Sequence, residues 1–586
     1  MNLYAGKILS VDLTSRDVSV RPLRQEWLPE YWGGWGLAAR YYYDLARAGT
    51  DPLAPENPLV IMTGPFCGTL VPTSARFCLV SRSPHTGTVF ESNMGGAFGP
   101  ELKMAGYDGL IITGRASAPV YIVIKDDQAA VQDAGEIWGR GIFETEVLLK
   151  EAAGSPEAKC LAIGPAGENK LTFACVGSEA FRQLGRGGAG ALFGAKNLKG
   201  IACRGTGAVA VADMKAFLDK VDYYKEHSVL QDANLWACQA GTSLLVDVTN
   251  EMGCHPTRNF ARGVNEGKAG INADAIARAK IADRACTSCP LACGKFTRLG
   301  RAEVEGPEYE TLCLAGSNCE INDLEAIIRF NRLCDDLGLD TITAGNVIGL
   351  AMDLTEKGIH DFGLRFGQVE SYLQAVSEMA GLSTDRGRDL ALGARKLADK
   401  YNAAHLAAQV KGLEMPAYEP RANYGMGLAY ATSERGACHL RAFTIFSAQP
   451  FDLETMAQEV VAGQNLAAVK WSMCFCDFWG NVDTAIMADL LSTGLGREVT
   501  ALELDLAGER IWNLLRVINV REGFSGDQDV LPDKMLQALL KGSQEGRVLA
   551  RADFLTMRRH YYSRRQWGED GRPTPAILER LRLNRL

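Results

Sequence analysis

The chain has 586 residues, of which 47% are hydrophobic, with a formal net charge of −8 and an isoelectric point near 5.6. This length allows several domains with a large buried core, and the acidic balance argues against a nucleic-acid-binding protein. No apolar run approaches the roughly 18 residues of a membrane span, and the first residues do not resemble a signal peptide. Sixteen cysteines in such a chain indicate free thiols, so we expect a soluble cytoplasmic protein.

The first part of the chain predicts mainly β-structure. Gly6–Leu13 and 18–20 predict a hairpin around a polar turn. Residues 109–114 and 120–124 predict a strand, a turn and a strand, and 199–205 followed by 208–210 repeats this pattern. The repetition suggests a duplicated β-unit.

From Asp213 onward the pattern becomes mostly helical. Residues 324–337 and 344–357 have strong helical periodicity, a boundary falls near 416–420, and the tail from 501 is helical again. We therefore predict an α+β protein with a β-rich domain over 1–210 and two mainly helical domains over 211–410 and 411–586.

Three cysteines at C-x2-C-x3-C spacing, Cys286, Cys289 and Cys293, lie in one short loop beside a proline and a glycine. Thiolates this close suit zinc or an iron–sulfur cluster, and both need four ligands. A zinc ribbon would need a second C-x2-C pair, and the only other close pair is Cys474 and Cys476. Three local thiols and one distant thiol favour a [4Fe–4S] cluster, with zinc or uncoordinated thiols as alternatives.

Two glycine-rich loops of the first domain, and a third segment with an arginine, indicate an anion site. Arg76 follows a Pro-Thr-Ser-Ala stretch, 93–99 reads Asn-Met-Gly-Gly-Ala-Phe-Gly, and 181–191 carries Arg182, Gly185 and Arg186. The last loop contains G-x-G-x-x-G, but no clean strand leads into it and no acidic residue follows at the required distance. A phosphate site therefore fits these loops better than a dinucleotide-binding fold, because glycines leave the backbone N–H groups open to phosphates and arginines lie beside them. Tight turns with solvated arginines are the alternative.

The turn at 334–340 joins the two periodic helices. Asn322 or Asp323 is expected to cap the first helix, Gly338 to end it, and Asp340 or Thr341 to begin the second. The turn places Asp335 and Asp340 beside free helix-start amides. A carboxylate can accept the amine and ring N–H edge of a bicyclic pterin, although simple helix capping would explain the same residues.

With these features together, the sequence resembles the tungsten-containing aldehyde ferredoxin oxidoreductase family over nearly its whole length. The matching motifs follow one another in order along the chain. They are found at 32–36, 105–108, 163–169, 196–199, 305–310, 416–421, 427–432 and 435–439.

The resemblance implies a β-rich first domain with a pseudo-twofold repeat that cradles a metal held by two pterins, and two helical domains that close over it. It implies a tungstopterin, with molybdenum as a possible metal, one [4Fe–4S] cluster, and room for a Mg²⁺ ion between the pterin phosphates. The implied cluster ligands are Cys286, Cys289, Cys293 and Cys476. The implied pterin and phosphate contacts are Arg76, Asn93, Gly95, Arg182, Gly185, Arg186, Asp335, Leu339, Asp340, Arg435 and Arg441. Glu310 and His439 fall at the family's acid–base positions, although either residue taken alone would more often be structural.

The implied reaction is the oxidation of an aldehyde with water to a carboxylic acid. In this reading a dry pocket raises the pKa of Glu310, which acts as base, and His439 donates to the developing alkoxide. Electrons pass through the cluster to ferredoxin or a polyferredoxin-like subunit. The alternatives are a ring-reducing subunit like that of class II benzoyl-CoA reductases, and a non-catalytic electron-transfer subunit.

Two positions depart from the family pattern. The second pterin signature, D-x-x-G-L-C, here reads Trp-Ser-Met-Cys-Phe-Cys over 471–476, so Trp471 replaces the pterin-binding aspartate and Cys474 becomes a rival cluster ligand. Arg329 and Arg332 stand where some relatives hold an interface iron, so we expect that any oligomer forms without that metal.

Overall fold

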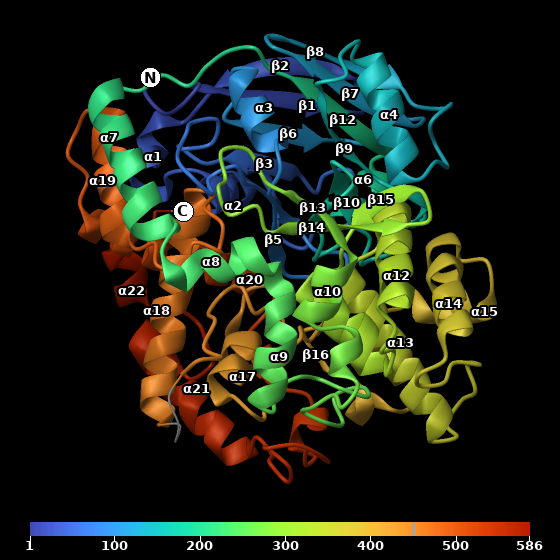
Figure 1. Ribbon diagram of the computed structural model, residues 1–586. Coiled ribbons are helices and arrows are strands. Elements are labelled where there is room, and N and C mark those ends of the chain that lie inside the picture. The colour runs from blue at the N-terminus through green and yellow to red at the C-terminus, as the bar shows by residue number, and fades with distance from the viewer. Residues whose placement is uncertain (448–451, 586) are drawn as a thin grey trace.

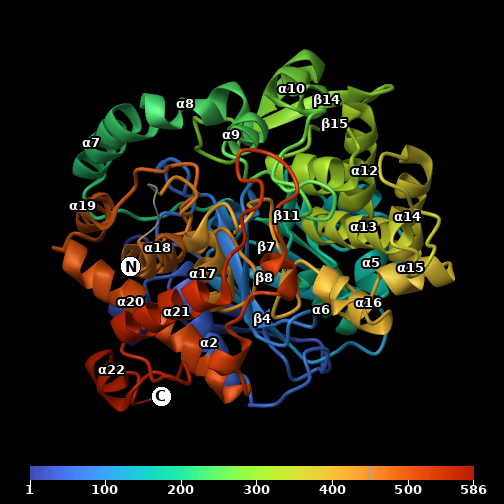
Figure 2. The same ribbon diagram turned by 90° about the horizontal axis from the view of Figure 1, so that it is seen from below.

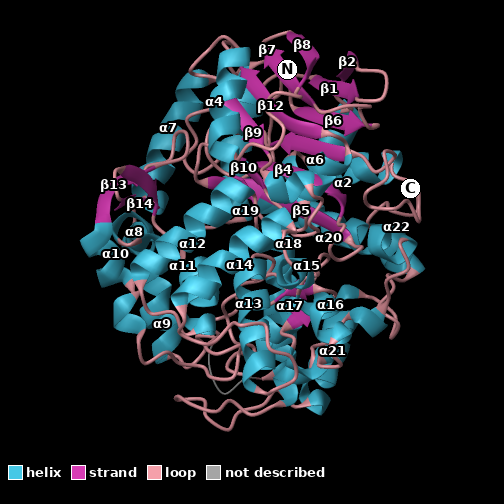
Figure 3. Cartoon of the chain, turned by 90° about the vertical axis from the view of Figure 1, so that its right-hand side faces the viewer, coloured by secondary structure: helices cyan, strands magenta, loops and turns pink. Residues whose placement is uncertain are grey.

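The computed structural model describes residues 1–447 and 452–585. Most strands gather at one end of the molecule, and helices make up most of the rest (Figure 3). The predicted α+β class is confirmed, whereas the division at 210 and 410 stays a prediction. Among the described residues, no helix combines the length and apolar content that a membrane crossing needs.

Two six-stranded sheets form the N-terminal part. The first has the order β2-β1-β6-β3-β4-β5 and contains β1 (Lys7–Asp12), β2 (Asp17–Pro22), β3 (Leu59–Thr63), β4 (Phe77–Arg82), β5 (Val89–Met94) and β6 (Gly109–Thr113). The second has the order β11-β10-β9-β12-β7-β8 and contains β7 (Val120–Lys125), β8 (Gln128–Asp133), β9 (Lys159–Ala162), β10 (Val176–Ser178), β11 (Arg182–Leu184) and β12 (Leu198–Arg204).

The two sheets are duplicates of each other in topology. Each begins with an antiparallel hairpin, β1–β2 or β7–β8, and each places its sixth strand parallel to the first. The predicted hairpin and the predicted duplication are confirmed, but the predicted repeating unit is wrong. β6 and β7 belong to different sheets because β6 pairs between β1 and β3, and residues 208–210 form no strand.

Six helices accompany the sheets. They are α1 (Leu28–Tyr31), α2 (Gly34–Leu45), α3 (Phe98–Met104), α4 (Ile142–Ala152), α5 (Pro165–Glu168) and α6 (Ala189–Ala195). β1 shows the alternation of a strand that is buried on both faces. Leu9 packs in a core shared by the two sheets, whereas Ile8 packs with α2 and the C-terminal helices.

The middle of the chain is mostly helical. Its helices are α7 (Met214–Tyr224), α8 (Asp232–Gln239), α9 (Leu245–Glu251), α10 (Ala273–Ala279), α11 (Tyr309–Thr311), α12 (Leu324–Leu337), α13 (Thr341–Glu356), α14 (Val369–Gly381), α15 (Asp385–Leu390) and α16 (Ala394–Lys400). The sequence patterns missed a three-stranded sheet of β13 (Lys280–Arg284), β14 (Gly294–Leu299) and β15 (Ala302–Glu305). The cysteine-rich loop connects β13 to β14.

The last part packs beneath the first sheet (Figure 2). It contains a small ribbon of β16 (Gln409–Val410) and β17 (Leu413–Glu414), followed by α17 (Tyr424–Thr432), α18 (Leu453–Ser472), α19 (Thr484–Leu495), α20 (Ala501–Arg521), α21 (Arg551–Arg565) and α22 (Pro575–Arg580). Helices α2, α18 and α20 share one apolar core with the first sheet.

Candidate functional site

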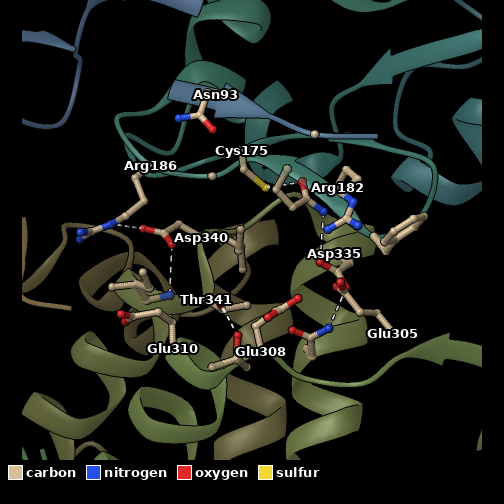
Figure 4. Close-up of a pocket in the computed structure, with 18 of the residues that line it drawn as sticks. Asn93, Cys175, Arg182, Arg186, Glu305, Glu308, Glu310, Asp335, Asp340 and Thr341 are labelled. Atoms are coloured by element: carbon tan, nitrogen blue, oxygen red, sulfur yellow. Dashed lines mark hydrogen bonds and ion pairs between the residues drawn. The ribbon is translucent and has the colours of Figure 1, made fainter. Parts of the chain in front are cut away.

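A cavity of about 260 Å³ lies where the N-terminal sheets meet the middle helices. Asn93, Arg182 and Arg186 face it from the sheets, and Glu310, Asp335 and Asp340 face it from the helical side (Figure 4). The predicted site residues that line it are Arg76, Asn93, Gly95, Arg182, Gly185, Arg186, Glu310, Asp335, Leu339 and Asp340. The fold therefore brings most of the predicted cofactor contacts together.

The turn between α12 and α13 builds the floor of this cavity. Gly338 ends α12 with φ +80°, a conformation that costs glycine little. Asp340 caps α13 by accepting the amide N–H of Ile342 at 3.1 Å, and its other oxygen lies 3.3 Å from Nε of Arg186. The predicted caps of both helices are confirmed, since Asp323 caps α12.

Asp335 presents a buried carboxylate to the cavity. Its oxygens accept hydrogen bonds from Nε2 of Gln183 at 3.1 Å and Nδ2 of Asn331 at 2.9 Å. Burial raises the pKa of Asp335 to about 7, against the lowering effect of Gln183 and Arg332. A ligand with N–H donors would stabilise its ionised form.

The two arginines of the glycine-rich loop at 181–191 differ in their hydrogen bonding. Arg186 donates to the backbone oxygens of Ala437 at 2.8 Å and Glu414 at 2.6 Å, and so ties the sheets to the C-terminal part. In Arg182, Nε and Nη2 are buried and have no hydrogen-bond partner among the described residues. An orphaned guanidinium facing a cavity fits a bound anion such as a phosphate.

The loop has a local architecture that the sequence patterns did not indicate. The short strand β11 leads into Gly185, and α6 begins after Gly188, which has φ +88°. The expectation that no strand runs into the G-x-G-x-x-G segment is therefore wrong. β11 escaped notice because it is only three residues long.

Four of the cysteines gather beside the cavity. The backbone N–H of Cys476 donates to the carbonyl of Thr73 at 3.0 Å. The thiol of Cys476 lies near enough to the loop of Cys286, Cys289 and Cys293 to act on the pKa values of Cys289 and Cys293. Burial, together with the nearby thiols of Cys476 and Cys286, raises the pKa of Cys289 to about 12. All four side chains are partly exposed.

Cys474 points elsewhere. It is buried, and a Cβ added to Gly34 would meet its sulfur at 2.7 Å, so its side chain packs in the core against α2. Cys476, by contrast, accepts from Nη2 of Arg76 at 3.2 Å. The structure therefore places Cys476, and not Cys474, with the loop thiols.

No group of three or more His, Cys, Asp or Glu residues within 1–447 and 452–585 is arranged to hold a single metal ion. A four-iron cluster is bound at its corners, and so needs sulfurs spaced more widely than those around one zinc ion. In the described part of the chain, the four thiols are thus not arranged around a single zinc ion.

Glu310 and His439 face each other at the edge of the cavity. Oε1 of Glu310 lies 3.5 Å from Nδ1 of His439, and neither atom has a hydrogen-bond partner among the described residues. Oε2 of Glu310 accepts the N–H of Ala417 at 2.9 Å. A polar group placed beside the pair could hydrogen-bond to both unpaired atoms.

Their protonation follows from burial. Burial raises the pKa of Glu310 to about 8, although the Ala417 N–H and Arg186 lower it. Burial, with the charges of Arg186, Arg435 and Arg441, holds the pKa of His439 well below its usual value. Near neutral pH, Glu310 is thus mostly protonated and His439 is uncharged, so they form no ion pair.

Arg435 and Arg441 do not line the cavity. Nη2 of Arg441 lies 2.9 Å from Oε2 of Glu91 and 2.5 Å from Oε1 of Glu434. Arg435 donates to the backbone oxygen of Glu91 and to the sulfur of Cys438. The structure gives both arginines protein partners in a separate buried cluster.

Some cavity residues had no predicted role. Glu305 and Glu308 line the cavity beside Asp335, and burial, with the charges of Asp335 and Glu308, raises the pKa of Glu305 well above its usual value. Both residues stand in the 305–310 motif, where only Glu310 was assigned. Gln183 lies inside the glycine-rich loop and could have been found there as a side chain between two arginines.

Comparison with known proteins gives a consistent result. The family model "Aldehyde ferredoxin oxidoreductase, N-terminal domain" matches residues 8–205, and "Aldehyde ferredoxin oxidoreductase, domains 2 & 3" matches 219–583. The tungsten-containing aldehyde ferredoxin oxidoreductase of Pyrococcus furiosus is 37% identical over 98% of both chains, and that of Thermococcus kodakarensis is 36% identical over 97% of both. An aliphatic sulfonate oxidoreductase, WOR-like subunit, of Pyrococcus furiosus is 30% identical over 99% of this chain and 97% of that protein.

Among solved structures, the active-site complex BamBC of benzoyl coenzyme A reductase, bound to 1,5-dienoyl-CoA, matches with a TM-score of 0.85. The match covers 100% of this chain and 98% of the other at 22% identity. At this identity the likeness establishes the fold only.

Proposed function

The chain belongs to the aldehyde ferredoxin oxidoreductase family, and from this premise we propose that it oxidises aldehydes with water to carboxylic acids. The reaction takes place at a tungsten or molybdenum centre held by pterins. Electrons leave through one [4Fe–4S] cluster to ferredoxin or an iron–sulfur partner subunit. The observation that carries this proposal is that Glu310, whose Oε1 lies 3.5 Å from Nδ1 of His439, lines the same cavity as the intact first pterin signature.

The residues present fit such a cofactor. Asp335 would accept the N–H edge of one pterin, and Asn93, Arg182 and Gly185 would hold its phosphate or a Mg²⁺ ion beside it. The unpaired nitrogens of Arg182 support this role, because a buried donor without a partner costs about 1–3 kcal/mol unless a ligand satisfies it. When bound, the metal–pterin group supplies the two-electron redox chemistry.

Glu310 and His439 would handle protons and orient the substrate. Ionised Glu310 takes a proton from the water that adds to the aldehyde carbonyl, and a pKa near 8 makes it a better base than an exposed carboxylate. Neutral His439 donates a hydrogen bond to the substrate oxygen. That oxygen would lie beside the pair, within hydrogen-bond distance of the unpaired Oε1 of Glu310 and Nδ1 of His439.

The approach to this pair is aromatic. The ring centre of Tyr418 lies 5.3 Å from that of His439 and 5.0 Å from that of Phe443. The ring centres of Phe443 and Phe446 lie 5.9 Å apart. Phe443 is 44% exposed and Phe446 is 64% exposed, so this row leads from the site to the surface. Such a wall favours apolar aldehydes, including aromatic ones, over charged ones.

Arg76 connects the two proposed redox groups. Its guanidinium contacts the sulfur of Cys476 at 3.2 Å and also Asn93, and the residue lines the cavity. A side chain that contacts both a cluster ligand and the pterin cavity supports electron transfer between them. All the cysteines are free thiols, which suits a reducing cytoplasm.

The proposal is tested by the metal content of anaerobically purified protein and by aldehyde oxidation with a viologen acceptor. We expect about one tungsten or molybdenum and about four iron atoms per chain, with turnover of apolar aldehydes. Iron without the heavier metal, and no turnover, would instead indicate an electron-transfer subunit. Zinc in place of iron would contradict the cluster.

A further inference from the structure

The second pterin signature lacks its carboxylate. Trp471 stands in that position at the end of α18 and is 2% exposed, with its indole Nε1 3.3 Å from Oδ1 of Asp477. An indole N–H is a donor and cannot accept the amine edge of a pterin. Another acceptor is needed if a second pterin binds here.

Glu91 places a buried carboxylate next to Trp471. Glu91 and Asn93 both lie on β5 and point to the same face of the sheet, because side chains of a strand alternate. Asn93 lines the cavity, so Glu91 lies one step further along the same face. The guanidinium of Arg441, which pairs with Glu91, lies 5.1 Å from the ring centre of Trp471.

Glu91 has one carboxylate oxygen that no N–H or O–H group of the described residues binds. Oε2 of Glu91 is bound by Arg441, whereas Oε1 is buried without such a donor, and only the thiol of Cys78, a weak donor, interacts with this carboxylate. Both oxygens of Glu434 accept from Arg441. Glu91, which is 0% exposed, is therefore the carboxylate with accepting capacity to spare.

Unpaired donors lie in the same buried cluster. Nη1 of Arg441, Nε of Arg435 and Nε1 of Trp35 are all buried without a partner in the described part of the chain. The guanidinium of Arg441 also lies 4.3 Å from the ring centre of Trp35. A buried polar group that stays unpaired destabilises the protein, so the cluster fits a polar ligand with donors and acceptors.

We propose that Glu91 replaces the missing aspartate and accepts the N–H edge of the second pterin. The pyrimidinone edge of a pterin presents an amine and a ring N–H beside a carbonyl oxygen. Oε1 of Glu91 accepts from the former, and a free N–H of Arg441 or Arg435 donates to the latter. This inference rests on the proposed function, since it concerns the same metal–pterin group.

The test measures tungsten or molybdenum, iron and pterin per chain in anaerobically purified protein. The wild type is expected to hold about two pterins per heavy metal, and Glu91→Gln about one or fewer, with iron unchanged. Glu434→Gln, in the same cluster, is the matched control and keeps the wild-type ratio. Trp471→Asp in the Glu91→Gln background is expected to restore the second pterin.

Several results would overturn the inference. They are a wild-type pterin ratio in Glu91→Gln, and one pterin per metal in the wild type itself. If Glu91→Gln does not fold, Glu91→Asp, which only shortens the side chain, must show the reduced ratio. A wild type without tungsten or molybdenum would defeat the proposed function instead, so the two failures are distinguishable.

Discussion

The two pterin signatures end their helices in the same way but carry different chemistry. In the first, the N–H of Leu339 donates to the carbonyl of Cys334; in the second, the N–H of Phe475 donates to that of Lys470, five residues back in both cases. Gly338 has φ +80° and Cys474, at the equivalent position, has φ +61°. The backbone turn is thus conserved without its glycine, whereas the side chain before it changes from a carboxylate to an indole.

The surroundings of the two turns differ accordingly. The first turn opens on a cavity with unsatisfied polar atoms, and Asp335 is held in place by Gln183 and Asn331. The second is packed against Trp35 and Arg441, both fully buried. The backbone geometry of the two turns is therefore the same whether or not a carboxylate precedes the turn, and only the long-range neighbours differ.

The largest effect is expected opposite the first turn, at Glu310. Glu310→Gln should lower kcat for aldehyde oxidation by about 100-fold or more, with metal and iron content unchanged, because a general base contributes about 10²–10⁴-fold. Steady-state assays with a viologen acceptor check this. Near wild-type turnover in the variant would remove Glu310 as the base.

The pH profile adds a second readout for Glu310. Because burial raises its pKa to about 8, kcat/KM of the wild type should increase as the pH rises through about 8 and level off above it. Burial and nearby arginines lower the pKa of His439. We therefore expect no change in kcat/KM near the usual histidine pKa of about 6.5. An activity that falls with rising pH over this range would assign Glu310 as an acid.

The comparison itself is tested by Asp335→Asn and Trp471→Phe. Asp335→Asn removes charge-assisted hydrogen bonds to the first pterin and should weaken cofactor retention about 10- to 100-fold. Trp471→Phe keeps a ring of similar packing and should leave retention unchanged, because the indole contributes no acceptor. Heavy metal retained per chain after gel filtration measures both, and equal losses would mean that the two turns are equivalent.

Much of the first turn could be predicted from local sequence. Asp323, Gly338 and Asp340 act through bonds to residues within five positions, so capping rules sufficed. Glu91 and Arg441 could not be paired in this way, because 350 positions separate them and only the tertiary fold joins β5 to the C-terminal part. β6 and β7 were assigned to one unit for the same reason: strand pairing is a long-range choice.

The thiols give the next contrast. Cys476→Ser should lower iron content by about half or more, since a four-iron cluster needs four ligands, whereas Cys474→Ser should keep it. Colorimetric iron and visible absorption of anaerobic protein measure the two variants side by side. The reverse pattern would make Cys474 the fourth ligand despite its position in the core.

The smallest effect concerns the backbone that the two turns share. Gly338→Ala should destabilise the protein by about 1–2 kcal/mol, because a Cβ at φ +80° is strained. Moreover, that Cβ would lie 3.1 Å from the nitrogen of Gly164. Cys474→Gly should change stability by less than about 1 kcal/mol, because relief of the left-handed strain offsets the loss of a buried sulfur.

Apparent Tm values of both variants, measured at one scan rate and matched cofactor content, compare these changes. A larger loss in Cys474→Gly than in Gly338→Ala would mean that the side chain, whose sulfur packs beside Gly34 and whose Cβ packs beside Gly64, stabilises the second turn more than its backbone strain costs. In that case the side chain of Cys474, which stands at the position of the signature glycine, helps Trp471 to pack the second turn. If Gly338→Ala instead loses more stability, as we expect, Cys474 is a tolerated replacement for glycine. The change that matters for function is then the loss of the aspartate at position 471, next to Glu91.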